Sequence, residues 1–239
     1  MRCSLIVSGK EPIILKSLES DTIGMFIVSD DGWTGSPAPR ESPITRVQTT
    51  GDYFPPRLTQ GARTVTLEAL GVFESELEAR EKVNHVLSFI GEKITLRVED
   101  PDAVRSVTGY ISDDPRFVFL ENGRVIQFSI ILTCPDPYKY EDAQAFAAAN
   151  GVIKALNRGN APTYPVVKVA GAVTSLTVAC GSQQVKWEGN ANGLTIDFKA
   201  MKPSSGILTL DNAFQLMPGW STINVSTNTA SVLVSSAWR

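Results

Sequence analysis

Most of this chain alternates apolar and polar residues with a period of two. In the segment KITLRVED, Ile94, Leu96 and Val98 share one face, and the polar residues between them share the other. The segments VIQFSIIL and GLTIDFK, which begin at Val125 and Gly193, follow the same rule. Successive side chains of a β-strand point to opposite faces, so the pattern predicts strands with one face on a core and one in water. The chain is therefore expected to be mainly β.

One segment, SELEAREKVNHVLSFIGEK, has helical periodicity instead. Ser75 and Glu78 fit a capping box at its start, and Gly91 fits the stop at its end. A helix is therefore expected over residues 75–90. The apolar stripe that should pack this helix on a sheet consists of Ala79, Val83, Val86, Leu87 and Ile90. A second and weaker helix is expected just after Tyr140, in EDAQAFAAAN.

Turn signals complete the β pattern. Asn122-Gly123 lies between two apolar-rich runs, and both residues tolerate positive φ, so a hairpin is expected there. After Gly151, strand-like segments follow one another at roughly the 8–12-residue spacing of an all-β sandwich. The stretch from Asp30 to Arg63 differs, because it is rich in Gly, Pro and Thr and only weakly patterned. We interpret it as an extended arm or hairpin that a partner orders.

The distribution of charge indicates a boundary within the chain. A length of 239 residues suits one large domain or two small ones. Residues 1–142 contain 15 basic and 22 acidic side chains, whereas the remainder contains 7 basic and 3 acidic ones. The shift predicts a domain boundary near its position. The net charge of −3 does not favour nucleic-acid binding, and no apolar run is long enough to span a membrane.

The sequence gives little sign of catalysis. Its single histidine, His85, has no nucleophile motif near it, and no phosphate-binding glycine motif occurs. Three widely spaced cysteines predict neither a disulfide framework nor a zinc site. The acidic pairs Asp30-Asp31 and Asp113-Asp114 are better explained as turn residues than as metal ligands. We therefore expect no enzyme activity, no cofactor and no metal.

The segment LTCPDPYKYED lies where the charge changes, directly after a predicted strand. Its two prolines fix φ and disfavour helix, so the chain should leave that strand in an extended form. A strand that ends in this way resembles the junction of siphophage distal tail proteins, in which a ring-forming domain ends in an (A/C)-P-D-P-x-x-Y segment. The residues of this junction motif are Cys134, Pro135, Asp136, Pro137, Tyr138 and Tyr140. The two tyrosines are the candidates to pin the domain junction.

The resemblance continues, in order, on both sides of the junction. Upstream, GDYFPPRLTQGARTVTLEALGVF resembles the family's glycine-bearing loop and the strand that starts here at Arg63. Downstream, NRGNAPTYPVVKVAG, from Asn157, resembles the opening of the family's galectin-like domain. GLTIDF and LMPGWSTINV resemble two strands of that domain. The ordered series covers nearly the whole chain.

The resemblance implies two domains and a linker. Residues 1–137 would be a ring-forming, tail-tube-like domain, a β-sandwich or split barrel with one packed helix. Residues 138–156 would be the linker, and residues 157–239 would be a galectin-like antiparallel β-sandwich.

The resemblance also implies a function. The chain would be a structural virion protein, a distal tail or baseplate hub component whose homo-hexameric ring joins the tail tube to the tail tip and host-adsorption apparatus. The implied partners are the tail tube protein, the tape measure protein and the baseplate hub or tail-associated protein, with receptor-binding proteins as candidates for docking on the second domain. DNA would pass through the lumen without specific binding, which suits the acidic first domain. The protein would be made in the host bacterial cytoplasm and would act at the phage tail tip.

Two alternatives belong to other functional classes. A carbohydrate-binding module for host-surface adsorption could use Trp187 to stack on a sugar ring, although a tryptophan beside a turn is more often packed at an edge. The second domain has no room for the large sugar-binding insertion of some family members, and it contains no histidine for a galectin-type site. A cell-wall hydrolase would need two carboxylates across a cleft. The second half offers only Glu188, Asp197 and Asp211.

Overall fold

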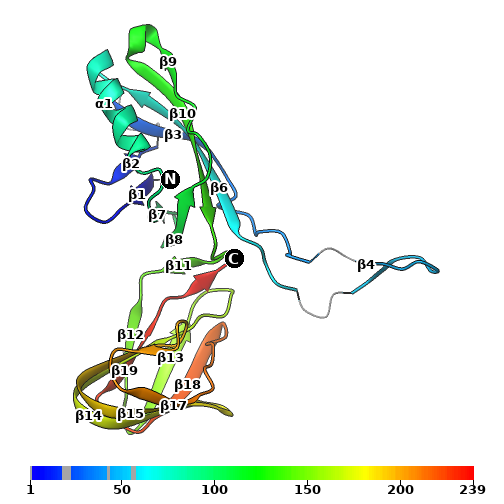
Figure 1. The fold of residues 1–239 in the computed structure, drawn as a ribbon, viewed down its shortest axis with the longest axis vertical. Helices are drawn as coiled ribbons and strands as arrows, with labels where there is room; N and C mark the ends of the chain where they lie inside the picture. Colours follow the sequence, from blue (N-terminus) through cyan, green and yellow to red (C-terminus); the bar gives the residue numbers. More distant parts are fainter. Residues whose placement is uncertain (1, 18–22, 42–43, 55–57) are drawn as a thin grey trace. The chain divides into compact units, whose positions relative to one another are not determined.

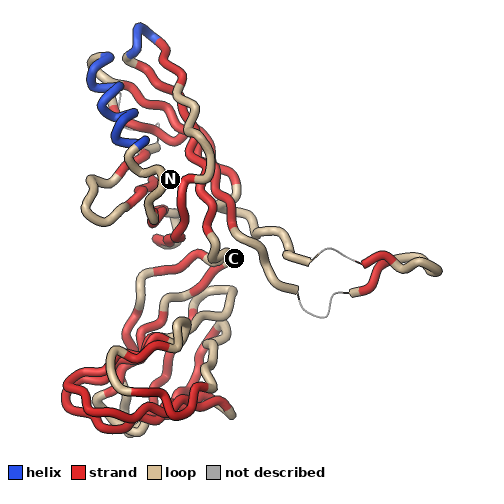
Figure 2. The backbone as a smooth tube through the Cα atoms, viewed as in Figure 1, coloured by secondary structure: helices blue, strands red, loops and turns tan. Residues whose placement is uncertain are grey.

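The computed structural model describes residues 2–17, 23–41, 44–54 and 58–239 (Figure 1). The chain divides into two compact units, the first ending at Lys139 and the second running from Tyr140 to Trp238. One α-helix occurs among the described residues, and nearly all other regular elements are strands (Figure 2). The protein is therefore mainly β, as the alternating pattern predicted.

The first unit is an antiparallel sheet whose two ends meet. Its strands follow the order β2 (Ile13–Leu15), β1 (Arg2–Ile6), β7 (Ile94–Glu99), β8 (Val104–Ile111), β10 (Val125–Cys134), β6 (Arg63–Val72) and β3 (Gly24–Asp31). A parallel bridge joins the two end strands: the N–H of Lys16 donates to the carbonyl of Met25 at 2.9 Å, and the N–H of Ile27 donates to the carbonyl of Lys16 at 2.8 Å. This bridge brings the two end strands of the sheet together, as in the expected β-sandwich or split barrel with one packed helix.

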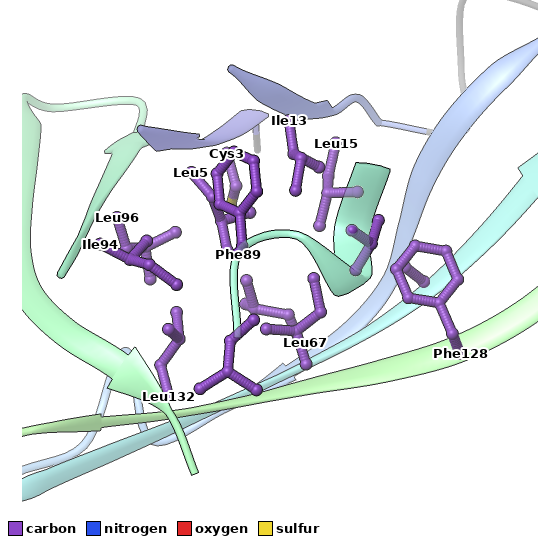
Figure 3. Close-up of a cluster of buried hydrophobic side chains, with 14 of the residues drawn as sticks. Cys3, Leu5, Ile13, Leu15, Leu67, Phe89, Ile94, Leu96, Phe128 and Leu132 are labelled. Carbon is purple, nitrogen blue, oxygen red and sulfur yellow. The ribbon is translucent and has the colours of Figure 1, made fainter. Parts of the chain in front are cut away.

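The core of the first unit lies between this sheet and the helix α1 (Glu76–Leu87) (Figure 3). Ile94, Leu96 and Val98 of β7 are buried, as the alternation predicted. Phe89, just beyond the helix, belongs to the same buried cluster. Burying each such side chain contributes about 1.5–3 kcal/mol, so the unit has a substantial core of its own.

The helix begins at the predicted cap. The Oγ of Ser75 accepts from the backbone N–H three residues later at 3.2 Å, and Gly91 follows with a φ of +84°. Two assignments to its buried stripe are wrong, because Leu87 is 39% exposed and Ile90 is 47% exposed. The helix ends at Leu87, so the next residues lose the helical spacing and Phe89 takes the buried position.

The predicted hairpin at Asn122-Gly123 is confirmed. Strand β9 (Val118–Leu120) pairs with the start of β10 across the turn η1 (Glu121–Gly123). Asn122 has a φ of +54° and Gly123 a φ of +81°. A Cβ on Gly123 would lie 2.6 Å from the Cγ of Glu76, so the turn also packs closely on the start of α1.

The second unit is a sandwich built around one long hairpin. Strands β14 (Val166–Cys180) and β15 (Gln183–Asp197) pair along their length, with register shifts between Val169 and Ser175. The two halves of this hairpin pair with different strands. One half lies with β12 (Gln144–Ala147), β19 (Ala230–Val234) and β16 (Lys202–Pro203); the other lies with β13 (Val152–Asn157), β18 (Gly219–Val225) and β17 (Ile207–Asp211). This is the antiparallel sandwich that the sequence predicted.

The helix predicted after Tyr140 is wrong. The segment forms β11 (Lys139–Glu141), which pairs with β20 (Ala237–Trp238), and then β12, which pairs with β19. Its alanines have the highest intrinsic helix propensity, but differences in propensity are small, and pairing with a distant strand overrides them. Most of the predicted linker, residues 138–156, consequently forms strands, and the second unit starts at Tyr140 rather than at residue 157.

Candidate functional site

The junction motif spans the exit segment of the first unit, which we define as residues 137–139. Cys134 ends β10 and is buried, and burial raises the pKa of its thiol to about 11. The carboxylate of Asp136 accepts from the backbone N–H of Tyr138 at 3.1 Å, which closes a short turn around Pro137. In the second unit, the Nζ of Lys199 lies 5.5 Å from the ring centroid of Tyr140. The role of the two tyrosines in pinning the junction stays a prediction.

Arg63 connects the exit segment to the arm root, which we define as residues 32–35. The side chain is 1% exposed, and its Nε donates to the carbonyl of Pro137 at 2.8 Å. Its Nη1 donates to three carbonyls of the arm root: those of Gly32 at 2.5 Å, Gly35 at 2.7 Å and Trp33 at 3.3 Å. Burial lowers the pKa of the guanidinium, while these carbonyl dipoles stabilise its charge.

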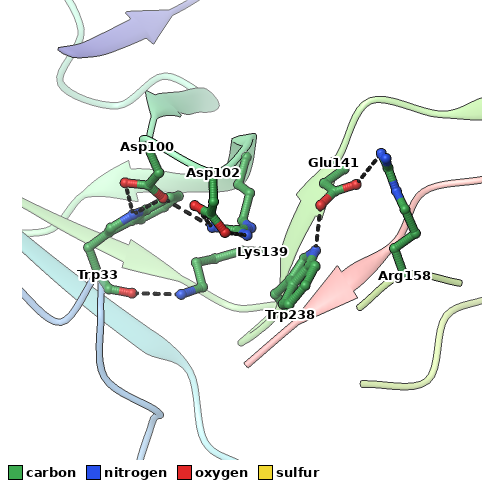
Figure 4. A network of polar contacts seen from close by, with 8 residues as sticks. Trp33, Asp100, Asp102, Lys139, Glu141, Arg158 and Trp238 are labelled. Atoms are coloured by element: carbon green, nitrogen blue, oxygen red, sulfur yellow. Dashed lines mark hydrogen bonds and ion pairs between the residues drawn. The ribbon is translucent and has the colours of Figure 1, made fainter. Parts of the chain in front are cut away.

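Trp33, in the arm root, is hydrogen-bonded to both Asp100 and Lys139 (Figure 4). Its buried indole donates from Nε1 to a carboxylate oxygen of Asp100 at 3.0 Å. Its carbonyl accepts from the Nζ of Lys139 at 2.9 Å, and this ammonium lies 5.3 Å from the indole centroid, within cation–π range. Burial lowers the pKa of Lys139, and the nearby charges of Arg63 and Arg105 lower it further. Lys139 thus fastens the exit segment to the arm root a second time.

An ion cluster holds the other side of Trp33. Arg105 reaches Asp102 through two bonds, of 3.2 and 2.5 Å, and contacts Asp100 at 3.3 Å. The hydrogen bond from Arg105 lowers the pKa of the Asp102 carboxyl. A continuous polar network therefore runs from an exposed carboxylate at Asp102 to the buried Trp33 and Lys139.

Sequence reasoning found only part of this network. The sequence identifies Arg63 as the first residue of a strand, but it gives no sign of the hydrogen bonds from Arg63 to Trp33 and Pro137. A large aromatic residue within the Gly- and Pro-rich stretch is the signal that could have identified Trp33. The structure also explains the glycine before it, because a Cβ on Gly32 would lie 1.9 Å from the carbonyl oxygen of Thr64.

The predicted arm is a hairpin in its described parts. Strand β4 (Ile44–Thr45) pairs with β5 (Asp52–Tyr53). An isolated antiparallel β-bridge joins Pro39 to Gln60, closer in sequence to the arm root and to β6. Residues 42–43 and 55–57 of the prediction lie outside the described part. The arm exposes five large apolar side chains: Ile44, Val47, Tyr53, Phe54 and Leu58. Exposed apolar residues gathered on one segment are typical of an interaction surface.

The motif that begins at Asn157 has a structural explanation. The buried Asn157 amide donates to the carbonyls of Ala161 at 2.8 Å and Leu216 at 3.1 Å, and its Oδ1 accepts from the N–H of Gly159 at 3.0 Å. A Cβ on Gly159 would lie 1.8 Å from the carbonyl oxygen of Ala237. The Asn-x-Gly-x-Ala spacing therefore fixes a loop against neighbouring strands.

A second polar group lies at the start of the second unit (Figure 4). The carboxylate of Glu141 is buried, and it accepts from the Nε1 of Trp238 at 2.9 Å and from Arg158 at 2.7 Å. The contact holds the penultimate residue of the chain on β11. This contact therefore has a structural role, and the Arg158 side chain remains half exposed to solvent.

Trp187 lies inside the second unit. The residue is 1% exposed, and its Nε1 donates to the carbonyl of Ser205 at 2.6 Å. Gly189 and Gly206 pack against the ring so closely that a Cβ on either would lie 2.7 or 2.6 Å from it. The indole has no exposed face on which a sugar ring could stack, so the structure supports a packing role for Trp187 and not sugar stacking.

His85 and the Asp113-Asp114 pair, the remaining candidates for a catalytic or metal site, make local structural contacts. The Nε2 of His85 lies 3.0 Å from the carbonyl of Glu11, and its ring meets Phe89 edge to face. The carboxylate of Asp113 accepts from the N–H of Asp114 at 2.8 Å, as in a turn. Within the described ranges, no three His, Cys, Asp or Glu side chains gather as metal ligands. No helix in those ranges is long and apolar enough to cross a membrane.

Comparison with solved structures identifies the fold. The Dit protein of phage SPP1, described as a paradigm of the hub adsorption apparatus in phages that infect Gram-positive bacteria, superposes with a TM-score of 0.73 and 12% identity over 99% of both chains. Chains of the phage P2 baseplate, in its activated conformation with Ca and with Sr, superpose with TM-scores of 0.57 and 0.53 at 10% identity over 98% of both chains. No protein-family model and no curated protein matches the sequence. The chain thus has, over nearly its full length, the fold of the phage distal tail (Dit) and baseplate proteins that its ordered motifs resemble.

Proposed function

We propose that this chain is a structural protein of a phage tail tip, in which six copies form a ring that joins the tail tube to the host-adsorption apparatus. The observation that carries the proposal is the match in fold to the hub protein of phage SPP1 over 99% of both chains. The similar proteins are parts of phage hubs and baseplates, which favours a structural role over a catalytic one.

A closed ring needs two different and complementary surfaces on every copy. The arm supplies one, because its apolar side chains are exposed in the single chain. The end of the first unit formed by α1 and β9 supplies the other, through exposed residues such as Leu77, Val118 and Leu120. Burying both sets in a head-to-tail contact is the driving force that we propose for ring closure.

The proposed partners follow from the position of such a ring. One face would meet the tail tube protein and the other the baseplate hub protein, with the tape measure protein and DNA passing through the pore. The excess of acidic over basic residues in the first 142 residues suits a lumen along which DNA slides, since it avoids phosphate contacts. The second unit would be a docking surface for receptor-binding or other baseplate proteins at the tail tip.

Electron microscopy of the purified chain, alone and mixed with tail tube protein, tests the proposal. Six-fold rings with a central pore are expected, and gold-labelled antibodies against the chain should mark the tip of virion tails. Particles without a pore, together with virions that bind no antibody, would contradict it.

A further inference from the structure

We infer that Arg63 and Lys139 form a latch that couples the arm root to the exit segment of the first unit. Both side chains donate to the carbonyl of Trp33, Arg63 at 3.3 Å and Lys139 at 2.9 Å. Arg63 also donates to the carbonyl of Pro137, within the exit segment. Two segments about a hundred positions apart in sequence are therefore joined through the same two side chains.

Burial makes the latch costly to open. Arg63 is 1% exposed and Lys139 is 7% exposed. A hydrogen bond to a charged donor contributes more than one between neutral groups, and breaking it here leaves a buried charge without its acceptor. A displacement of the arm root is therefore expected to draw the exit segment with it rather than to separate from it.

The guanidinium of Arg63 has a second arrangement available. Three carbonyls of the arm root share Nη1, which carries two hydrogens, whereas the buried Nη2 has no acceptor among the described residues. A small shift of the arm root can transfer one carbonyl from Nη1 to Nη2 without reducing the number of paired donors. Two packings with similar hydrogen bonding are the property that a switching element requires.

Contacts of Gly32 and Trp33 determine which end of the arm root can move. Gly32 is fixed against Thr64, and the indole of Trp33 is fixed by Asp100, so the arm root has a firm inner end. The outer end continues into the arm with its exposed apolar side chains. Contact of the arm with any partner would therefore be transmitted to residues 137–139, the last residues before the second unit. The latch is a property of the single chain, so it can be tested whether or not rings form.

Hydrogen exchange on the full-length Lys139→Met variant tests the coupling from the exit side. The substitution keeps an apolar side chain against Trp33 and removes one donor from its carbonyl. We expect the amides of residues 33–36 to exchange about tenfold faster, the effect of roughly 1.4 kcal/mol, with no change in β7. The matched control is Lys93→Met at an exposed lysine, which should leave residues 33–36 unchanged.

The Arg63→Lys variant tests the coupling from the other side. It keeps the charge but cannot hold Pro137 and the arm root together, so exchange should rise in residues 33–36 and in 138–139. Combining it with Lys139→Met should raise exchange by less than the product of the two single effects. The inference would be overturned if each substitution raised amide exchange only next to the substituted residue. It would also be overturned if the effects of the two substitutions on exchange simply multiplied in the double variant. If Arg63→Lys unfolds the chain, the Lys139→Met result decides alone.

Discussion

Asn157 is a buried side chain that ties together several segments of the second unit. Its amide pairs with Ala161, Leu216 and Gly159, and its Oδ1 also lies 3.4 Å from the N–H of Ala237. No other short side chain offers two donors and two acceptor sites at once. The sequence motif around Asn157 is therefore explained by the hydrogen bonds that this side chain makes with backbone groups of its own loop and of neighbouring segments.

Replacement of Asn157 by alanine should destabilise the second unit by about 2–4 kcal/mol, because several buried backbone groups lose a hydrogen bond together. Urea unfolding followed by tryptophan fluorescence measures the change. The control is Asn224→Ala on the exposed face of β18, which should change the free energy of unfolding by less than about 0.5 kcal/mol. Equal effects of the two substitutions would show that the bonds of Asn157 do not stabilise the loop.

The thiol of Cys134 should make stability depend on pH above neutrality. Its pKa is about 11 in the folded chain, against an ordinary value of 9.0. The unfolded chain therefore releases this proton first, so the free energy of unfolding falls as the pH rises from about 9 to about 11. Unfolding of wild type and Cys134→Ala at pH 8, 9.5 and 10.5 measures this fall. The gap between the two proteins should narrow across the series, and a constant gap would contradict the assignment.

At the scale of single elements, the sequence predicted those whose signals are local. The cap of α1, the Asn122-Gly123 hairpin and the alternation of β7 and β10 each depend on neighbouring residues, and each is confirmed. Strand β12 was mistaken for a helix because only its distant partner β19 determines its conformation. The Arg63 and Trp33 network was missed for the same reason, since its residues come together only in the folded chain.

The cap of α1 gives a test at this scale. Ser75→Ala should lower the free energy of unfolding of the first unit by about 1 kcal/mol, because one backbone N–H of the first turn loses its acceptor. Ser75→Asp keeps an acceptor and should retain nearly all of the stability. Thermal unfolding followed by circular dichroism compares the variants. A similar loss for both would mean that the hydroxyl acts through something other than capping.

The arm is the element on which assembly is expected to depend. Val47 is 97% exposed and Phe54 is 82% exposed, so replacing either by aspartate should leave the fold of the chain intact. A charge there would have to be buried in a contact between copies, and we expect it to abolish the ring. Sedimentation velocity distinguishes ring from monomer. The matched control, Ile207→Asp at a 65% exposed site in the second unit, should still assemble.

At the scale of the whole molecule, the likeness to phage hub proteins rests on fold and order rather than on shared residues. Identity to the similar structures is only 10–12%, yet both units match along 98–99% of the chain. The motif residues Asn157, Gly159 and Asp136 have steric or hydrogen-bonding roles in the fold. Such residues identify a fold, whereas the surfaces that contact partners leave no comparable pattern in one sequence.

Native mass spectrometry of the wild-type chain at micromolar concentration tests the central claim most directly. A closed ring of six predicts one dominant species at six times the 25.9 kDa chain mass, with no ladder of other stoichiometries. The species should dissociate into monomers in the Val47→Asp variant. A wild-type chain that stays monomeric, alone and in the presence of tail tube protein, would contradict a ring-forming hub.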